Sequence, residues 1–220
     1  MGLAPIWRLK HRPQAAAAPI AAGTTQAGGS REEGIARMDW PALKAAVKGC
    51  TACGLRAGCT QTVFGVGDES ARWLLVGEAP GAEEDRLGEP FVGQAGKLLD
   101  NMLAAIGLAR GKEVYIANVL KCRPPGNRNP EPDEVVKCSP YLVRQVELIR
   151  PKLIVAMGRF AAQALLNTDA TIGSLRGAVH RYREVPLIVT YHPAYLLRNL
   201  PDKAKAWADL LFAKKTVAGG

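Results

Sequence analysis

The sequence lacks any long hydrophobic run, since no apolar stretch approaches the roughly 18 residues that a membrane-spanning helix requires. It also lacks the long, proline-free apolar core of a secretory signal. The first 30 residues, MGLAPIWRLKHRPQAAAAPIAAGTTQAGGS, carry prolines and basic side chains instead. We therefore expect no membrane contact, no export and a cytoplasmic location.

Acidic residues are absent before Glu32, in a stretch rich in alanine, glycine and proline. An organelle transit peptide has a similar composition, but a disordered extension is the interpretation that we prefer. The helical pattern MDWPALKAAV begins at Met38, with Asp39 as the expected N-cap and Pro41 in the first turn. We expect a disordered extension over 1–37, one folded domain over 38–215 and a short tail over 216–220.

The charge balance is strongly basic, with 29 Lys and Arg against 20 Asp and Glu and a net charge of +9. Such a balance favours a polyanionic partner, and nucleic acid is the default candidate. A contribution to solubility alone is the alternative. With 220 residues and 48% hydrophobic content, the chain is long and apolar enough for one well-filled domain.

Short apolar runs alternate with helical patterns along the chain. This alternation predicts βαβ units, and hence an α/β fold in which helices cover both faces of a central, mainly parallel four-stranded sheet. In such sheets, the functional site lies beyond the carboxyl ends of the strands. The expected strands are 72–78, 114–120, 152–158 and 186–192; the expected helices are 94–108, 131–149 (interrupted by Pro140), 159–166 and 202–215.

Four of the five cysteines form a pattern. Cys50 and Cys53 make a C-x2-C pair that can bring two thiolates to one metal, and Cys122 and Cys138 can complete a four-thiolate site. The spacing does not distinguish zinc from an iron–sulfur cluster, and four unconnected buried thiols remain an alternative. We interpret Cys59 as a small core residue or a free thiol.

Taken together, several motifs resemble the family 4, iron–sulfur-containing uracil-DNA glycosylases. These motifs are the C-x2-C pair, GEAPGAEEDRLGEPFVGQAGKLLD, YIANVLKCRPPGNRNPEPDEVVKC and HPAYLL, and the resemblance runs from about Trp40 to Phe212. It implies a three-layer α/β/α sandwich that removes uracil from DNA by base flipping, and therefore a catalytic domain over 38–215. It also implies that the four patterned cysteines hold a [4Fe-4S] cluster of structural role, with zinc as the alternative.

The resemblance implies a set of uracil-binding residues around the strand ends. Gly77 and Ala79 lie in the GEAPG loop, and Phe91 matches the residue that stacks on the flipped base. Asn118 matches the amide that reads the Watson–Crick edge of uracil. His192, in a chain with only three histidines, matches the donor to the departing uracil oxygen.

The acidic side chains of the GEAPGAEED loop are candidates for orienting water and for stabilising positive charge on the sugar. Glu84 is our first choice for this catalytic role, Glu78 the second, and Asn127 a polar third. The alternative is that Glu83, Glu84 and Asp85 only cap a helix and solvate its first turn.

Basic residues near the same loops are expected to hold the DNA, and Leu196 or Leu197 could wedge into its minor groove. We expect binding to single- or double-stranded DNA containing uracil, weakening steeply with salt, by a monomeric protein. The expected DNA-binding residues are Lys121, Arg123, Arg128, Leu196 and Arg198.

Two other functions remain open at this stage. A protein that binds damaged DNA without catalysis, or that traps it covalently, is one alternative; Ala79 stands where the trapping relatives carry Gln, which favours turnover. An electron-transfer iron–sulfur protein is the second, but it leaves the HPAYLL and NVLKC loops unexplained.

Overall fold

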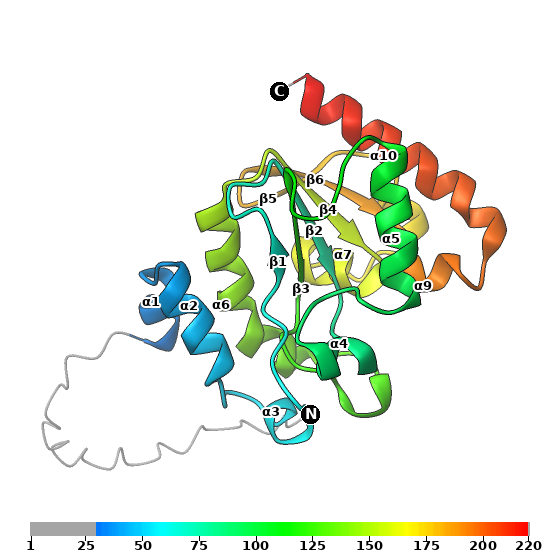
Figure 1. Ribbon diagram of the computed structural model, residues 1–220. Helices are drawn as coiled ribbons and strands as arrows, with labels where there is room; N and C mark the ends of the chain where they lie inside the picture. Colours follow the sequence, from blue (N-terminus) through cyan, green and yellow to red (C-terminus); the bar gives the residue numbers. More distant parts are fainter. Residues whose placement is uncertain (1–29, 220) are drawn as a thin grey trace, which may run out of the picture.

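The computed structural model describes residues 30–219, and its centre is a six-stranded sheet of order β1-β3-β2-β4-β6-β5 (Figure 1). The four inner strands are parallel and correspond to the four expected from the sequence. Two short antiparallel edge strands extend the sheet, so the expected number of four was too small. The strands are β1 Val66–Gly67, β2 Trp73–Gly77, β3 Val114–Asn118, β4 Leu153–Met157, β5 His180–Tyr182 and β6 Val185–Thr190.

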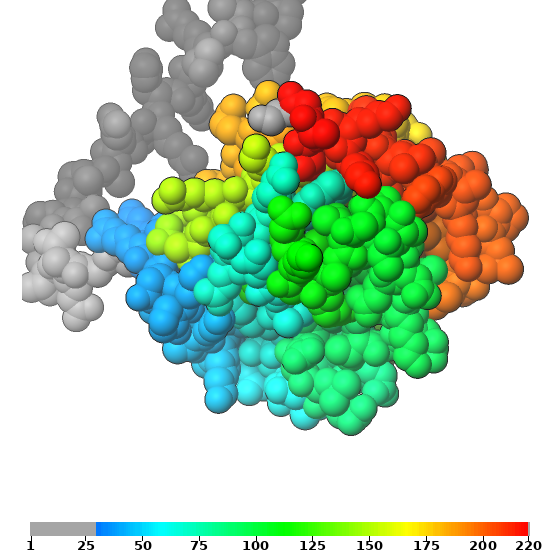
Figure 2. Space-filling model, turned by 45° about the horizontal axis from the view of Figure 1, so that its top comes forward, coloured from blue at the N-terminus to red at the C-terminus, as the bar shows by residue number. Residues whose placement is uncertain are grey.

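Helices cover both faces of this sheet, as the three-layer fold requires. Apolar side chains of α6 and α7 pack on one face, and those of α5 and α10 pack on the other. Figure 2 shows the second side, with α5 in green and α10 in orange and red at the surface. The helices are α1 Arg31–Ala36, α2 Trp40–Lys48, α3 Leu55–Gly58, α4 Ala82–Leu87, α5 Gln94–Ala105, α6 Pro132–Ile149, α7 Arg159–Leu166, α8 Ile172–Leu175, α9 Pro193–Leu196 and α10 Lys203–Ala218, with 3₁₀ turns η1 Pro125–Asn127 and η2 Leu200–Asp202.

Both expected ends of the folded domain need correction. Helix α1 begins at Arg31 with Ser30 as its N-cap, and Ile35 is buried among side chains of α2 and α6. At the other end, Val217 is buried and α10 continues to Ala218. Residues 30–37 and 216–218 therefore belong to the packed structure, and the rest of the expected extension lies outside the described residues.

Helix α6 runs through Pro140 without a break, contrary to the expected interruption. The helix buries a stripe that includes Tyr141, Leu142 and Val146. An internal proline removes one backbone hydrogen bond, and its ring clashes with the preceding turn of the helix. Burial of the apolar stripe outweighs this cost. Among the described helices, none is long and apolar enough to cross a bilayer.

Candidate functional site

The polar loops meet at the carboxyl ends of the parallel strands, as expected for an open α/β sheet. They line an open pocket of about 780 Å³ whose walls come from the loops after β2, β3, β4 and β6. Nine of the residues selected from the sequence line it: Glu78, Ala79, Glu84, Phe91, Asn118, Asn127, Arg128, His192 and Arg198. Gly77, the last residue of β2, is buried beside them.

Asn118 provides the most distinctive polar group of this pocket. It is the last residue of β3, is only 2% exposed, and lies opposite Gly77 in the β2–β3 register. Its Oδ1 is buried without a hydrogen-bond partner, which holds for no other side-chain oxygen or nitrogen in the described part of the chain. An unpaired buried acceptor costs about 1–3 kcal/mol. The pocket therefore presents an acceptor that a ligand donor can satisfy.

Phe91 and His192 form an aromatic wall beside this acceptor. Their ring centroids lie 5.4 Å apart with planes inclined by 30°. Gly77 makes room for this arrangement, because a Cβ at that position would collide with the Phe91 ring and with Asn118 Oδ1. A flat ligand bound here would meet an aromatic ring and an amide at the same time.

The hydrogen bonds of His192 indicate its tautomer. Its Nδ1 accepts from the backbone N–H of Ala194 at 3.1 Å, so the proton of a neutral ring sits on Nε2. Burial, helped by the positive charge of Arg198, lowers the pKa of His192 to about 4. The ring is therefore neutral at physiological pH and acts as a hydrogen-bond donor through Nε2.

Glu78 is the carboxylate of the acidic loop that the fold leaves without a hydrogen bond among the described residues. It lines the pocket, and burial raises its pKa to about 7, against the opposing effect of the positive charge on Arg159. A carboxylate with a pKa near neutrality is suited to accept a proton. The geometry favours Glu78 for the catalytic role.

The other acidic side chains of the loop have structural partners. Glu84, the first choice from the sequence, accepts from the backbone N–H groups of Gly81, Val92 and Gly93 at 2.9–3.2 Å. Asp85 is buried and accepts from the Thr60 and Gln61 backbone. Glu83 pairs with Arg86. Glu84 thus caps α4, as the alternative proposed, whereas the buried Asp85 joins the helix to the backbone of residues 60–61 instead of solvating it.

Lys121 does not reach the surface of the protein, so the expectation that it contacts DNA needs correction. Its side chain is buried, and Nζ donates to the Asn118 carbonyl at 2.9 Å and to Gln145 Oε1 at 2.7 Å. Burial lowers its pKa to about 8. Lys121 instead supports the backbone of Asn118 from behind.

The remaining basic candidates divide into paired and free side chains. Arg128 binds Glu134 at 2.6 Å, and Arg123 donates to Asn127 Oδ1 at 2.7 Å, so both are held by the loop itself. Arg198 is exposed at the pocket rim, and the ion pairs among residues 30–219 do not include it.

The expected role of Leu196 as a wedge also needs correction, because its side chain is 1% exposed and packs with Tyr191 and Ala206. A side chain in this position cannot enter a DNA groove. Leu197, the other residue considered for a wedge, is 42% exposed. At the end of α9, Leu196 therefore points into the core and Leu197 points to solvent.

Sequence reasoning missed Arg159 and Phe160, which also line the pocket. Arg159 begins α7 and lies over the Phe160 ring, 4.5 Å from its centroid, and it takes part in none of the ion pairs of the described residues. The available signal was position: GRF directly follows an expected strand, where parallel sheets place their sites.

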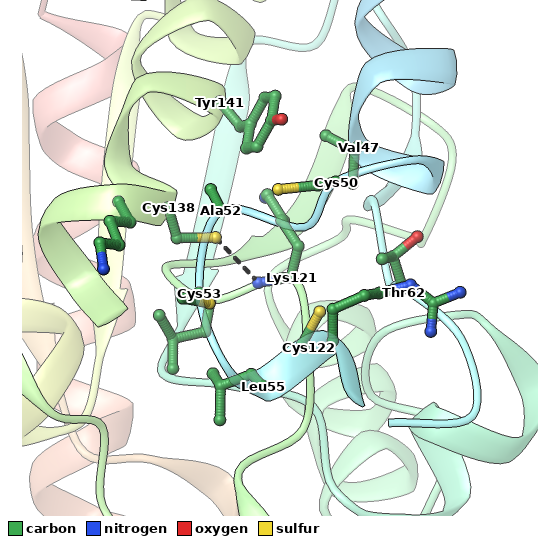
Figure 3. A pocket seen from close by; sticks show the side chains of 13 residues that line it. Val47, Cys50, Ala52, Cys53, Leu55, Thr62, Lys121, Cys122, Cys138 and Tyr141 are labelled. Carbon is green, nitrogen blue, oxygen red and sulfur yellow. Dashed lines mark hydrogen bonds between the residues drawn. The ribbon is translucent and has the colours of Figure 1, made fainter. Parts of the chain in front are cut away.

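The four patterned cysteines line a second, apolar cavity next to this pocket. Figure 3 shows the sulfur atoms of Cys50, Cys53, Cys122 and Cys138 directed toward one space, from the α2–α3 segment, the loop after β3 and helix α6. They are not joined by disulfides. Within residues 30–219, no three or more His, Cys, Asp or Glu side chains are arranged to hold a single metal ion.

Two hydrogen-bond donors lie close to sulfur atoms of this cavity. The Lys121 backbone N–H donates to Cys138 Sγ at 3.3 Å, and Arg31 Nη2 lies 4.0 Å from Cys50 Sγ. Burial nevertheless raises the pKa of Cys138 to about 11. Four thiolates would therefore require a cationic group between them.

Comparison with known proteins agrees with this arrangement. Residues 64–211 match the family model described as Uracil DNA glycosylase superfamily. The Type-4 uracil-DNA glycosylase of Archaeoglobus fulgidus is 53% identical over 69% of this chain and 79% of its own length. The corresponding proteins of Pyrobaculum aerophilum and Thermotoga maritima are 41% and 45% identical, over 79% and 72% of this chain and 92% and 83% of their lengths.

The similarity expected from the sequence motifs is thus confirmed, and so is the α/β/α fold. A Type-5 uracil-DNA glycosylase of Pyrobaculum aerophilum is 36% identical over 60% of the chain and 66% of its own length. The matched region contains the loops after β2, β3, β4 and β6 that build the pocket. The chain belongs to the uracil DNA glycosylase superfamily.

Proposed function

We propose that this protein is a uracil-DNA glycosylase that flips uracil out of DNA and hydrolyses its N-glycosidic bond, releasing free uracil and leaving an abasic site. The observation that carries the proposal is the unpaired, buried Oδ1 of Asn118 beside the ring of Phe91. Glycosylases act on a base outside the stack, because the glycosidic bond is inaccessible within a duplex.

The donor and acceptor of the Asn118 side chain complement the Watson–Crick edge of uracil but not that of cytosine. Its Oδ1 can accept from N3–H of uracil while its amide N–H donates to O4, whereas cytosine presents an acceptor at N3 and a donor at C4. Phe91 supplies the stacking surface, which is worth about 1–3 kcal/mol per base. Together they offset the few kcal/mol that unstacking costs.

His192 stabilises the departing base. Bond cleavage leaves negative charge on uracil, largely at O2, and a preorganised donor aimed at that atom lowers the barrier. The neutral ring donates through Nε2, while the Ala194 N–H holds Nδ1. Because the proton stays on His192, the uracil leaves as an anion that is stabilised by a hydrogen bond.

Glu78 acts on the sugar and on the attacking water. The sugar gains positive charge as the bond breaks, and a nearby carboxylate stabilises that charge and orients the attacking water. Glu78 is free of other hydrogen bonds among the described residues, whereas Glu84 is held by three backbone N–H groups. We therefore assign the carboxylate role to Glu78.

We propose further that Cys50, Cys53, Cys122 and Cys138 hold a [4Fe-4S] cluster. Four thiols around one apolar cavity fit the ligand set of such a cluster. When bound, the group cross-links the α2–α3 segment, the loop after β3 and helix α6.

DNA contacts are proposed for the free cations at the pocket rim. Arg198 and Arg159 line the pocket and are exposed. Leu197, also exposed, replaces Leu196 as the candidate for filling the space left by the flipped base.

A glycosylase assay on anaerobically purified protein tests the proposal. Labelled oligonucleotides with one uracil, single- and double-stranded, are incubated with the protein and then cleaved at abasic sites with alkali. Oligonucleotides with cytosine or thymine at the same position run alongside. Cleavage is expected only at uracil.

The variants Asn118→Ala and His192→Ala should lose this activity, while Asn101→Ala, on the exposed side of α5, should retain it. A protein that binds uracil-containing DNA tightly but releases no uracil would contradict the enzyme proposal. That outcome would favour a damage-binding function.

A further inference from the structure

The backbone of Phe91 is held in a conformation that a large side chain rarely adopts. Its φ of 56° lies in the left-handed region. The residue nevertheless directs its ring into the pocket, where it stacks with His192. Contacts from other parts of the chain must therefore maintain this conformation.

Arg110 makes the principal contacts. Its Nη1 donates to the Pro90 carbonyl at 2.8 Å, and its Nη2 donates to the Phe91 carbonyl, also at 2.8 Å. Asp100 of α5 orients the guanidinium through contacts of 3.1 Å to Nε and 3.0 Å to Nη2. A rigid planar fork suits two adjacent carbonyls, and the single ammonium of a lysine does not reproduce it.

Helix α5 closes the other side of the same carbonyl. A Cβ on Gly96 would overlap the Phe91 carbonyl group, so the first turn of α5 can pack there only with glycine. The Phe91 carbonyl is thereby enclosed between Gly96 and Arg110. Arg110 itself does not line the pocket.

We propose that Arg110 is a positioning residue for base binding: it sets the orientation of the Phe91 ring, and through it the affinity of the pocket for uracil. This inference rests on the proposed function, because it assigns a role to Phe91 as the stacking surface. It predicts that Arg110 acts only through Phe91.

A double-mutant cycle tests this dependence. Arg110→Ala, Phe91→Ala and the double variant are compared with the unaltered protein. The two measurements are the affinity for free uracil, by calorimetry, and the single-turnover rate constant on a single-stranded uracil oligonucleotide. We expect Arg110→Ala to weaken uracil binding about 10-fold, a part of the stacking contribution. In the Phe91→Ala background, the same change should alter it less than about twofold.

Two further variants separate positioning from general stability. Arg110→Lys should give an intermediate loss, since a single ammonium nitrogen does not reproduce the planar fork that holds both carbonyls and Asp100. Arg144→Ala is the matched control: Arg144 also binds a carbonyl and a carboxylate, Met38 O at 2.7 Å and Glu147 at 3.2 Å, and is 20% exposed against 23% for Arg110. It should lower the melting temperature without changing uracil affinity.

Equal effects of Arg110→Ala with and without the Phe91 ring would overturn the inference. So would a loss of uracil affinity in Arg144→Ala as large as in Arg110→Ala, or full affinity in Arg110→Ala. Should Arg110→Ala fail to fold, the comparison rests on Arg110→Lys in the same two backgrounds. Absence of uracil release by the unaltered protein would instead refute the proposed function, which keeps the two failures distinct.

Discussion

The pocket and the cysteine cavity are neighbours that share the loop after β3, yet they are opposite in chemistry. The cavity gathers four identical sulfur atoms in apolar surroundings. The pocket combines an amide, an imidazole, a carboxylate and an aromatic ring, and each of them comes from a different segment. A repeated ligand type can be recognised from spacing, whereas a mixed site depends on where each side chain points.

The two sites also share their supporting residues. Lys121 donates its side chain to the Asn118 carbonyl and its backbone N–H to Cys138. Ala79 lines the pocket and also packs against a group of buried hydrophobic side chains that includes Leu55 and Cys122. These shared residues connect the two sites, and the following variants test how far each site is independent of the other.

The largest effect is expected from Asn118→Leu, which fills the same volume with no polar atom. Uracil release should fall by about 10⁴-fold, since a site built on hydrogen bonds rejects strongly when they are lost. The melting temperature should rise, because the unpaired buried Oδ1 is removed. Single-turnover kinetics and thermal unfolding measure the two effects.

Iron content should remain unchanged in Asn118→Leu, and loss of iron would show that the sites are not separable. A fall in the melting temperature of Asn118→Leu would contradict our interpretation that the unpaired Oδ1 of Asn118 lowers stability and is kept for binding a ligand.

Glu78→Gln should reduce the single-turnover rate by about 10³-fold. In the unaltered protein, the rate should rise with pH through about 7, the raised pKa of Glu78, as the carboxylate ionises. His192 should contribute no inflection between pH 5 and 9, because burial keeps its pKa near 4. Glu84→Gln serves as the comparison, and a larger loss there would return the role to Glu84.

Stability offers an independent reading of Glu78. Because its folded-state pKa lies above the ordinary value of 4.5, its contribution to stability is complete below pH 4.5 and is lost as the pH rises through 7. Glu78→Gln should therefore raise the melting temperature at pH 8 by about 2–4 °C, with no gain at pH 4. An equal gain at both pH values would point to packing instead of ionisation.

Cys138→Ser should remove the visible absorbance and the bound iron, and lower the melting temperature by about 5 °C or more. Cys59→Ser is the matched control: Cys59 is buried nearby and its thiol contacts Arg56 and Cys122, but it does not line the cavity, so iron should be retained. Retention of iron by Cys138→Ser, or its loss in Cys59→Ser, would contradict the proposed ligand set.

The smallest effect is expected at the rim. Arg159→Ala should reduce the salt dependence of DNA affinity by about one unit in the slope of log K against log salt. Arg128→Ala should change the slope less, because Glu134 already neutralises that side chain. Equal changes in both variants would indicate that Arg128 leaves its partner when DNA binds.

Much of the molecule could be predicted from the sequence because its signals are local. The four inner strands are apolar runs, and the order of strands and helices restricts the topology to a parallel sheet with its site at the carboxyl ends. The edge strands escaped prediction because β1 and β5 are two and three residues long and only partly buried.

For the charged residues, the sequence did not predict which side chains are buried or hydrogen-bonded and which are free. Glu78 and Glu84 lie six residues apart in one acidic loop, but only the first is free to act on a substrate. Lys121 and Arg123 are two residues apart, and one is buried while the other is not. Pattern alone did not distinguish Leu196 from Leu197 either.

The sequence by itself determined the four inner strands, the strand ends at which the site forms and the four cysteines that share a cavity. Only the tertiary structure decided which of the neighbouring polar residues face the pocket and which stabilise its loops. The physical reason is that a buried polar group must find a partner. Those partners come from segments distant in the chain, as Arg110 does for Phe91, and the residues left without one form the site.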